Sequence, residues 1–253
     1  MPGTLRLTFA ILWLAACLPA AAQWLNYPTP GLPRTRDGKP NLSAPVPRTP
    51  DGKPDLSGIW EQQNARTTGY YLNGIDFPWQ PWGKAVYDAR TENNQKDNPE
   101  GFCLPRGLPK ADAFDLHKIV QTPGLILILY EYQNNYRQIF LDGRPLPKDP
   151  NPTWMGYSVG HWEGDTLVVE SNGFNGKAWL SFRGNPISDA LHLTERFHRR
   201  DLGHMDVELI IDDPKAYTKP WKTELHPELV ADTELLESVC QENERDQRHL
   251  VGK

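Results

Sequence analysis

Short runs of alternating apolar and polar residues, separated by turn residues, fill most of the chain after Ala113. This alternation places successive side chains on opposite faces of a β-strand, so each run predicts one strand. Dipeptides such as Pro123-Gly124 mark the turns between runs. Together with a strand at Trp60, the predicted strands cover residues 114–121, 125–132, 136–141, 155–162, 166–171, 191–199, 204–211 and 221–226.

A total of about eight to nine strands predicts an all-β, mainly antiparallel fold. It favours a closed or nearly closed barrel, because closure removes exposed strand edges and leaves room for one small ligand. A sandwich of two sheets is the alternative. One short helix is predicted between Trp82 and Asn94, where apolar residues recur at helical spacing. The segment 232–244 fits either a helix or a final strand.

The first 22 residues have the layout of a secretory signal peptide, with Arg6, an apolar run over 7–16 and small residues up to Ala22. We therefore expect a mature chain from Gln23 in the periplasm or outside a bacterial cell. The apolar run is too short to cross a hydrocarbon core of about 30 Å, so no transmembrane span is expected. Alternatively, residues 14–17 resemble a lipobox, which would make Cys17 a lipid anchor.

Export would place Cys103 and Cys240, the two cysteines of the mature chain, in an oxidising compartment. We therefore expect one disulfide between them, with two buried free thiols as the alternative. The bond would join the C-terminal segment to the region before the main sheet. In the chain-entropy model it would stabilise the fold by roughly 4 to 5 kcal/mol.

A proline-rich leader, 23–54, precedes a single predicted barrel domain, 55–253. Its prolines exclude helix formation and central strand pairing. Residues 34–43 and 48–57 repeat one pattern 14 residues apart, and each copy holds an Asp-Gly-Lys-Pro turn. We expect an extended, duplicated strap laid over the barrel, with a peptide-recognition motif as the alternative.

Charge and motifs exclude several classes of function. With 27 Lys and Arg against 32 Asp and Glu, the chain has a net charge of -5 and lacks the basic field that nucleic acid requires. It also lacks a Gly-x-Ser-x-Gly elbow, a phosphate-binding loop, a Cys-x-x-Cys pair and a His-Glu-x-x-His motif. No cofactor is expected. A tight hairpin would place His204 near His198 and Asp206 near Arg196, but this spacing matches no zinc signature, so no metal is expected.

The strongest candidate for polar chemistry is Glu131 with Arg137. If residues 133–135 form a tight turn, these two side chains lie opposite each other on neighbouring strands. Desolvation drives a carboxylate toward neutrality, while a nearby guanidinium keeps it charged. The pair could therefore transfer a proton or orient the polar end of a ligand. The alternative is a partly solvated salt bridge.

Histidines and aromatic residues supply the other candidates. His161 and His117 lie on predicted strands and are candidate proton carriers, because histidine titrates near neutrality. A core position is the alternative for each. Glycines at 156 and 160 clear space along one strand. The predicted aromatic walls of a ligand cavity are Tyr130, Tyr132, Tyr136, Trp154 and Tyr157.

Two resemblances bear on the fold. The tripeptide Gly58-Ile59-Trp60 resembles the first signature of the lipocalin (calycin) barrels. That resemblance implies a barrel around a small ligand, with a late-strand arginine such as Arg196 packed across Trp60. The strings 136–144, 162–170 and 194–197 resemble a large group of secreted, functionally uncharacterised bacterial proteins, which implies an exported bacterial domain.

The function expected from these observations is the binding of a small, partly apolar molecule in an aromatic-lined cavity. The ligand would be aromatic, lipid-like or glycosidic. One alternative is a cofactor-free acid-base enzyme, such as a lyase, hydratase or isomerase, on the same scaffold. Another is an envelope structural protein without a ligand, whose barrel would be filled by its own side chains. The first two place residues 131 and 137 in an internal hollow.

Overall fold

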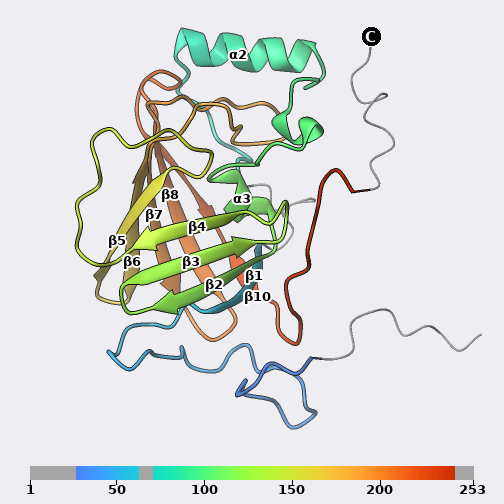
Figure 1. Ribbon diagram of the computed structural model, residues 1–253, viewed down its shortest axis with the longest axis vertical. Coiled ribbons are helices and arrows are strands. Elements are labelled where there is room, and N and C mark those ends of the chain that lie inside the picture. The colour runs from blue at the N-terminus through green and yellow to red at the C-terminus, as the bar shows by residue number, and fades with distance from the viewer. Residues whose placement is uncertain (1–26, 63–70, 243–253) are drawn as a thin grey trace, which may run out of the picture.

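The computed structural model describes residues 27–62 and 71–242 as one nearly closed barrel of ten strands (Figure 1). The all-β prediction is confirmed, with slightly more strands than predicted. The strands are β1 Gly58–Gln62, β2 His117–Thr122, β3 Leu125–Tyr130, β4 Tyr136–Phe140, β5 Tyr157–Glu163, β6 Thr166–Asn172, β7 His192–Arg199, β8 Met205–Asp212, β9 Trp221–Leu225 and β10 Pro227–Leu229.

The sheet runs in the order β10-β1-β2-β3-β4-β5-β6-β7-β8-β9, and its neighbours are antiparallel except for the parallel pair β4–β5. Strands β9 and β10 lie at opposite edges of the sheet, yet only His226 separates them in the chain. The chain therefore bends from one edge to the other and joins them. A bridge between His204 and Glu228, beside the start of β8, draws the two edges together.

The described helices are α2 Pro81–Glu92, α3 Lys110–Phe114 and the 3-10 turn η1 Pro99–Phe102. Helix α2 confirms the predicted helix and begins at Pro81, a residue suited to the first helical turn because its missing N–H is not needed there. Helix α3 was not predicted. Its five residues are all buried, and the strand expected from Phe114 begins only at His117.

Large side chains fill the interior of the barrel. Trp60, Tyr130, Ile128, Leu193 and Leu209 point inward and are each at most 2% exposed. Full burial of one such side chain contributes about 1.5–3 kcal/mol. The interior that we expected to be hollow is therefore packed, and this corrects the predicted location of a ligand cavity.

An arginine does lie across Trp60, but it is Arg199 and not the expected Arg196. The Arg199 guanidinium sits 4.8 Å from the centre of the Trp60 ring. Arg196 faces the outside of β7, where it pairs with Glu163 at 2.8 Å. The two arginines lie on opposite faces of the strand because they are three positions apart, and an odd offset reverses the face.

The duplicated leader forms two similar folded loops across the end of the molecule opposite α2 (Figure 1). In each loop an arginine donates to a glycine carbonyl four residues later, from Arg34 to Gly38 and from Arg48 to Gly52. Each guanidinium also binds an aspartate outside the leader with two hydrogen bonds, Asp232 after β10 for the first copy and Asp165 between β5 and β6 for the second. The repeat therefore provides two equivalent clamps.

The predicted disulfide between Cys103 and Cys240 is confirmed, with a Cα–Cα distance of 5.6 Å. The described part of the segment 232–244 forms neither a helix nor a strand, so both alternatives for it are wrong. The segment packs beside the turn after β3, where Ser238 makes a single parallel bridge to Tyr132. In the described ranges, no helix is both long and apolar enough to span a membrane.

Candidate functional site

Arg137 on β4 connects strands that share little backbone pairing. Strand β4 pairs with β5 through only two residue pairs, beginning at Ile139. The side chain of Arg137 is 1% exposed and crosses this seam toward the interior. Its Nε atom donates to Ser158 of β5 at 3.1 Å, and its Nη2 atom donates to Ser171 of β6 at 3.0 Å.

The carboxylate partner of Arg137 is Glu195 on β7. The two groups form a bidentate pair, with an Nη1–Oε1 distance of 3.1 Å. Asp112 of α3 accepts a further hydrogen bond from Nη1 at 3.4 Å. A guanidinium has five N–H donors, and the five contacts to these two carboxylates and to Ser158 and Ser171 use all of them. Arg137 therefore links β4 to three other strands and α3.

Burial and pairing act in opposite directions on this pair. Burial lowers the pKa of the Arg137 guanidinium, but Glu195 and Asp112 more than offset this effect and raise it. Burial raises the pKa of the Glu195 carboxyl, while Arg137 acts against that rise. Removing either partner would leave an uncompensated charge in the core. The stability of the Arg137–Glu195 pair in the core therefore requires both side chains.

A second, largely buried ionic group adjoins the first through α3. Arg106 pairs with Glu100 at 2.7 Å and also with Asp115, while Lys110 of α3 pairs with Glu100. Burial raises the pKa of Asp115 to about 7 and lowers the pKa of Lys110 to about 8. Helix α3 thus carries two buried ionisable residues, Lys110 and Asp112, and its C-terminal cap, Asp115, is a third.

An open groove of about 340 Å³ lies beside the seam. The loop between β4 and β5, yellow-green in Figure 1, projects from the barrel wall, and its residues Thr153 to Gly156 line one side of the groove. The groove is lined by Pro105, Asn135, Tyr136, Arg137, Gln138, Phe140, Thr153, Trp154, Met155, Gly156, Tyr157 and Ser158. Four of these residues are aromatic, and Tyr136 is 60% exposed. Both Arg137 and Ser158 belong to the buried network, so the network forms the floor.

The local sequence keeps the groove open. Gly156 has a φ of +67°, and a Cβ there would lie 2.8 Å from both the Asn172 carbonyl oxygen and the Phe174 ring. Only glycine fits such a position without strain. A parallel bridge between Thr153 and Phe174 holds the same turn against the residues just after β6. The chain therefore joins β4 only from Ser158 onward, and the beginning of β4 faces the groove.

One wall of the groove is a prearranged stack. Phe140 and Tyr157 stack across the seam, with ring centres 5.3 Å apart and ring planes inclined by 27°. The Arg144 guanidinium covers Phe140 at 3.9 Å and donates to the Tyr157 hydroxyl at 3.1 Å. Asp142 pairs with Arg144 and holds it there. These contacts within the protein hold the Phe140 and Tyr157 rings in position.

The predicted partnership of Glu131 with Arg137 is wrong. In the β3–β4 pair, Leu129 faces Tyr136 and Ile128 faces Arg137, so the register differs from the expected one by three residues. An odd shift moves Arg137 to the buried face. Glu131 lies beyond the end of β3 and accepts a hydrogen bond from the Leu236 N–H at 2.9 Å.

The β7–β8 hairpin differs from its expected register by two residues. His198 faces Asp206 and Arg196 faces Glu208, whereas His204 lies before β8 and contacts Asp201 at 2.7 Å. The even shift leaves the faces unchanged. Among the described residues, no group of three or more His, Cys, Asp or Glu is placed to hold a metal ion.

The two histidine candidates lie in opposite environments, and neither lines the groove. His117 is 3% exposed, and its Nδ1 atom donates to the Asp115 carbonyl at 2.9 Å. Burial lowers the pKa of His117 to about 4, so its ring is neutral at physiological pH. His161 is exposed on β5 beside Glu163, at 3.3 Å.

The aromatic candidates divide into two sets. Tyr136, Trp154 and Tyr157 line the groove together with Arg137. Tyr130 is buried and donates to Asp112 at 2.6 Å, and Tyr132 lies over Arg106 at 4.4 Å. Four of the six predicted ligand-binding residues therefore meet at one place, outside the barrel interior.

Sequence reasoning missed the acceptors around Arg137. Glu195 gave a usable signal, because it lies between Leu193 and Phe197 on the apolar face of its strand. A carboxylate at such a position requires a buried cation. Asp112, Ser158 and Ser171 gave no comparable signal, because short polar residues are common on exposed faces as well.

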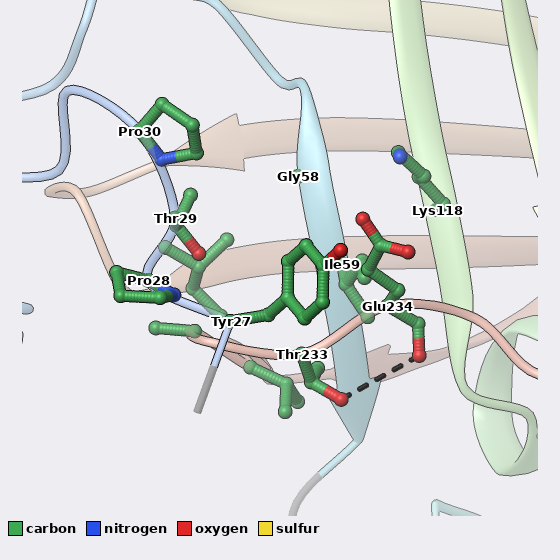
Figure 2. A pocket seen from close by; sticks show the side chains of 12 residues that line it. Tyr27, Pro28, Thr29, Pro30, Gly58, Ile59, Lys118, Thr233 and Glu234 are labelled. Carbon is green, nitrogen blue, oxygen red and sulfur yellow. Dashed lines mark hydrogen bonds between the residues drawn. The ribbon is translucent and has the colours of Figure 1, made fainter. Parts of the chain in front are cut away.

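A second pocket, of about 160 Å³, lies where the leader crosses β1. Figure 2 shows Tyr27, Pro28 and Thr29 of the leader on one side of Ile59, with Lys118 and Glu234 beyond it. Its aromatic residue, Tyr27, is 61% exposed. The pocket has less than half the volume of the groove and lies away from the buried network. We therefore take the groove as the candidate site.

Comparisons with protein-family models, with curated proteins and with solved structures find no match to this chain. The fold and the site therefore define its class by themselves. It is a nearly closed, mainly antiparallel β-barrel with a packed interior and an aromatic groove at its one parallel seam among the described strands.

Proposed function

We propose that this protein is an exported binding protein that takes a small, partly apolar ligand in the groove between β4 and β5. The observation that carries the proposal is the meeting of four aromatic side chains over a floor of buried, hydrogen-bonded polar groups. Small-molecule sites are typically concave and mostly apolar, with a few placed polar groups, and start at about 300 Å³. The groove has these properties.

Rigidity of the site supports binding. The Phe140–Tyr157 stack and the Asp142–Arg144 pair are formed within the protein itself. Tyr and Trp also provide large contact areas with few rotatable bonds. A ligand would therefore order few groups on binding, which reduces the entropic cost.

Export is part of the proposal. The apolar segment at residues 7–16 supports it, although that segment lies outside the described residues. The Cys103–Cys240 disulfide is of the kind that persists in oxidising compartments. We propose the bacterial periplasm or the extracellular medium as its location, with a lipid anchor at Cys17 as the alternative.

The proposal is tested by native mass spectrometry of protein purified from its natural compartment. We expect a bound small molecule on the wild-type protein and its loss from a Tyr136→Ala/Trp154→Ala variant. Trp82→Ala is the matched control, because Trp82 is 47% exposed on α2 and away from the groove. Equal ligand retention by all three proteins would show that the ligand binds elsewhere.

The packed interior favours a second candidate, an envelope structural protein without a ligand. The two arginine clamps and the disulfide that tie the chain ends to the barrel are also consistent with such a role. This candidate predicts that protein from its natural compartment carries no small molecule. It also predicts that the Tyr136→Ala/Trp154→Ala variant performs normally in the cell.

A further inference from the structure

The charges at the groove are already neutralised by the protein. Arg137 is the only charged residue that lines the groove in the described part of the chain, and its N–H donors are used by Ser158, Ser171, Glu195 and Asp112. At the rim, Arg144 is paired with Asp142. In the described part of the groove, no cation is therefore free to bind a carboxylate or phosphate, and the groove suits an uncharged ligand.

Three lining residues keep polar atoms available. Among the described residues, the Gln138 amide, the Tyr136 hydroxyl and the Trp154 indole N–H have no hydrogen-bond partner. Gln138 and Tyr136 are exposed, and Trp154 is partly buried. They supply both donors and acceptors along one groove. A ligand that covers them must offer hydrogen-bonding groups at several points.

The same residues present flat apolar surfaces. Tyr136 and Trp154 contribute aromatic rings beside the Phe140–Tyr157 stack. The face of an aromatic ring carries partial negative charge and attracts the weakly positive C–H groups of another ring. The groove lining therefore carries both hydrogen-bonding atoms and flat apolar surfaces.

These observations together select among uncharged ligands. A purely aromatic or lipid-like molecule would cover the rings but leave the amide, hydroxyl and indole groups unpaired, at a cost of roughly tenfold in affinity for each. A sugar ring has C–H groups on its faces and hydroxyl groups around its edge, so it satisfies both. We propose that the groove binds a neutral saccharide, an inference that rests on the proposed function.

Isothermal titration calorimetry of the full mature chain tests this inference. The probes are cellohexaose, xylohexaose, maltohexaose and chitohexaose, with 2-naphthol as a neutral aromatic comparator and 2-naphthoate as an anionic one. We expect at least one saccharide to bind, with an affinity that changes less than about twofold between low and high salt, because no ion pair forms. We expect neither naphthalene to bind more tightly.

Two conservative variants locate the binding. Gln138→Leu removes the free amide, and Trp154→Phe removes the indole N–H while it keeps an aromatic ring. Each should weaken saccharide binding about tenfold, the value of one hydrogen bond lost from a covered site. Trp82→Phe, on α2, should leave the affinity unchanged. Equal affinities for all four proteins would overturn the saccharide assignment of this groove.

The remaining outcomes separate the two proposals. Binding of 2-naphthol or 2-naphthoate that is lost in Tyr136→Ala, without binding of any saccharide, would overturn the saccharide inference and leave the groove as a ligand site. Absence of binding by every probe, together with absence of a small molecule on the natural protein, would contradict both proposals.

Discussion

Arg137 is the residue on which the site depends most. Its side chain replaces the backbone pairing that β4 and β5 lack, because it bonds to β5, β6, β7 and α3 from one position. A buried ion pair of this kind adds little net stability over an apolar pair of the same shape. Its value lies in placing β4 and the groove floor in one arrangement.

Arg137→Met should lower the free energy of unfolding by about 3–5 kcal/mol, because it leaves Glu195 buried without its cation. A double variant, Arg137→Met with Glu195→Leu, should recover part of that loss. Urea denaturation measures both. Arg196→Met is the control on an exposed pair and should cost under about 1 kcal/mol. A loss of under 1 kcal/mol for Arg137→Met would contradict the role given to this residue.

His117 gives a prediction of pH dependence. Its folded-state pKa is lowered from 6.5 to about 4 by burial, so the folded protein excludes a proton that the unfolded chain binds. The stability linked to His117 is therefore complete above pH 6.5 and is lost as the pH falls toward 4. The loss is roughly 3 kcal/mol.

The His117→Asn variant isolates this effect, since asparagine does not titrate but can still donate to the Asp115 carbonyl. The comparison is needed because Asp115, whose pKa is raised, acts in the opposite direction over the same pH range. We expect the stability difference between wild type and variant to shrink as the pH falls from 7 to 4. A constant difference would show that His117 does not resist protonation.

At the scale of elements, local pattern predicted which segments are strands but not how two of them align. The alternation in β3 and β4 was read correctly, and its register was wrong because the turn was taken to be short. Residues 131–135 form a longer connection, in which the Glu131 N–H donates to the Leu116 carbonyl and Ser238 pairs with Tyr132. Those partners come from distant parts of the chain, so the neighbouring residues carry no signal for them.

The sequence predicted most of the groove residues but not the way they come together. Tyr136, Trp154, Tyr157 and Arg137 were identified from aromatic content and from charge on an apolar strand. Their meeting at a parallel seam depends on the path of the loop between β4 and β5, which has no periodic pattern. Helix α3, with Asp112, was missed because five residues are too few to show helical spacing.

The C-terminal segment should depend on its disulfide. The bond closes a separation of 137 residues, so the Cys103→Ser/Cys240→Ser variant should lose up to roughly 5 kcal/mol of stability in the chain-entropy model. We also expect faster amide exchange at Leu236 and Ser238, whose N–H groups donate to Glu131 and Asn134. Unchanged exchange at these two positions would show that the hydrogen bonds hold the segment in place even without the disulfide.

At the scale of the whole molecule, the barrel closes by a bend in one continuous segment. His226 separates β9 from β10, and its N–H donates to the Gln62 side chain at 2.5 Å. Strand count alone predicted this closure, because a sheet of this size avoids exposed edges. Whether the interior is hollow depends on which side chains turn inward. Trp60 and Tyr130 do so and fill the interior, whereas the groove lies outside it at the seam.

The groove and the interior can be distinguished by one NMR titration with the molecule that co-purifies with the protein, following two indole N–H signals. The Trp154 indole lies in the groove, whereas the Trp60 indole lies in the interior and donates to the Leu56 carbonyl at 3.0 Å. We predict a saturable shift of the Trp154 signal and an unchanged Trp60 signal. A shift of Trp60 with Trp154 unchanged would place the ligand inside the barrel and contradict the account.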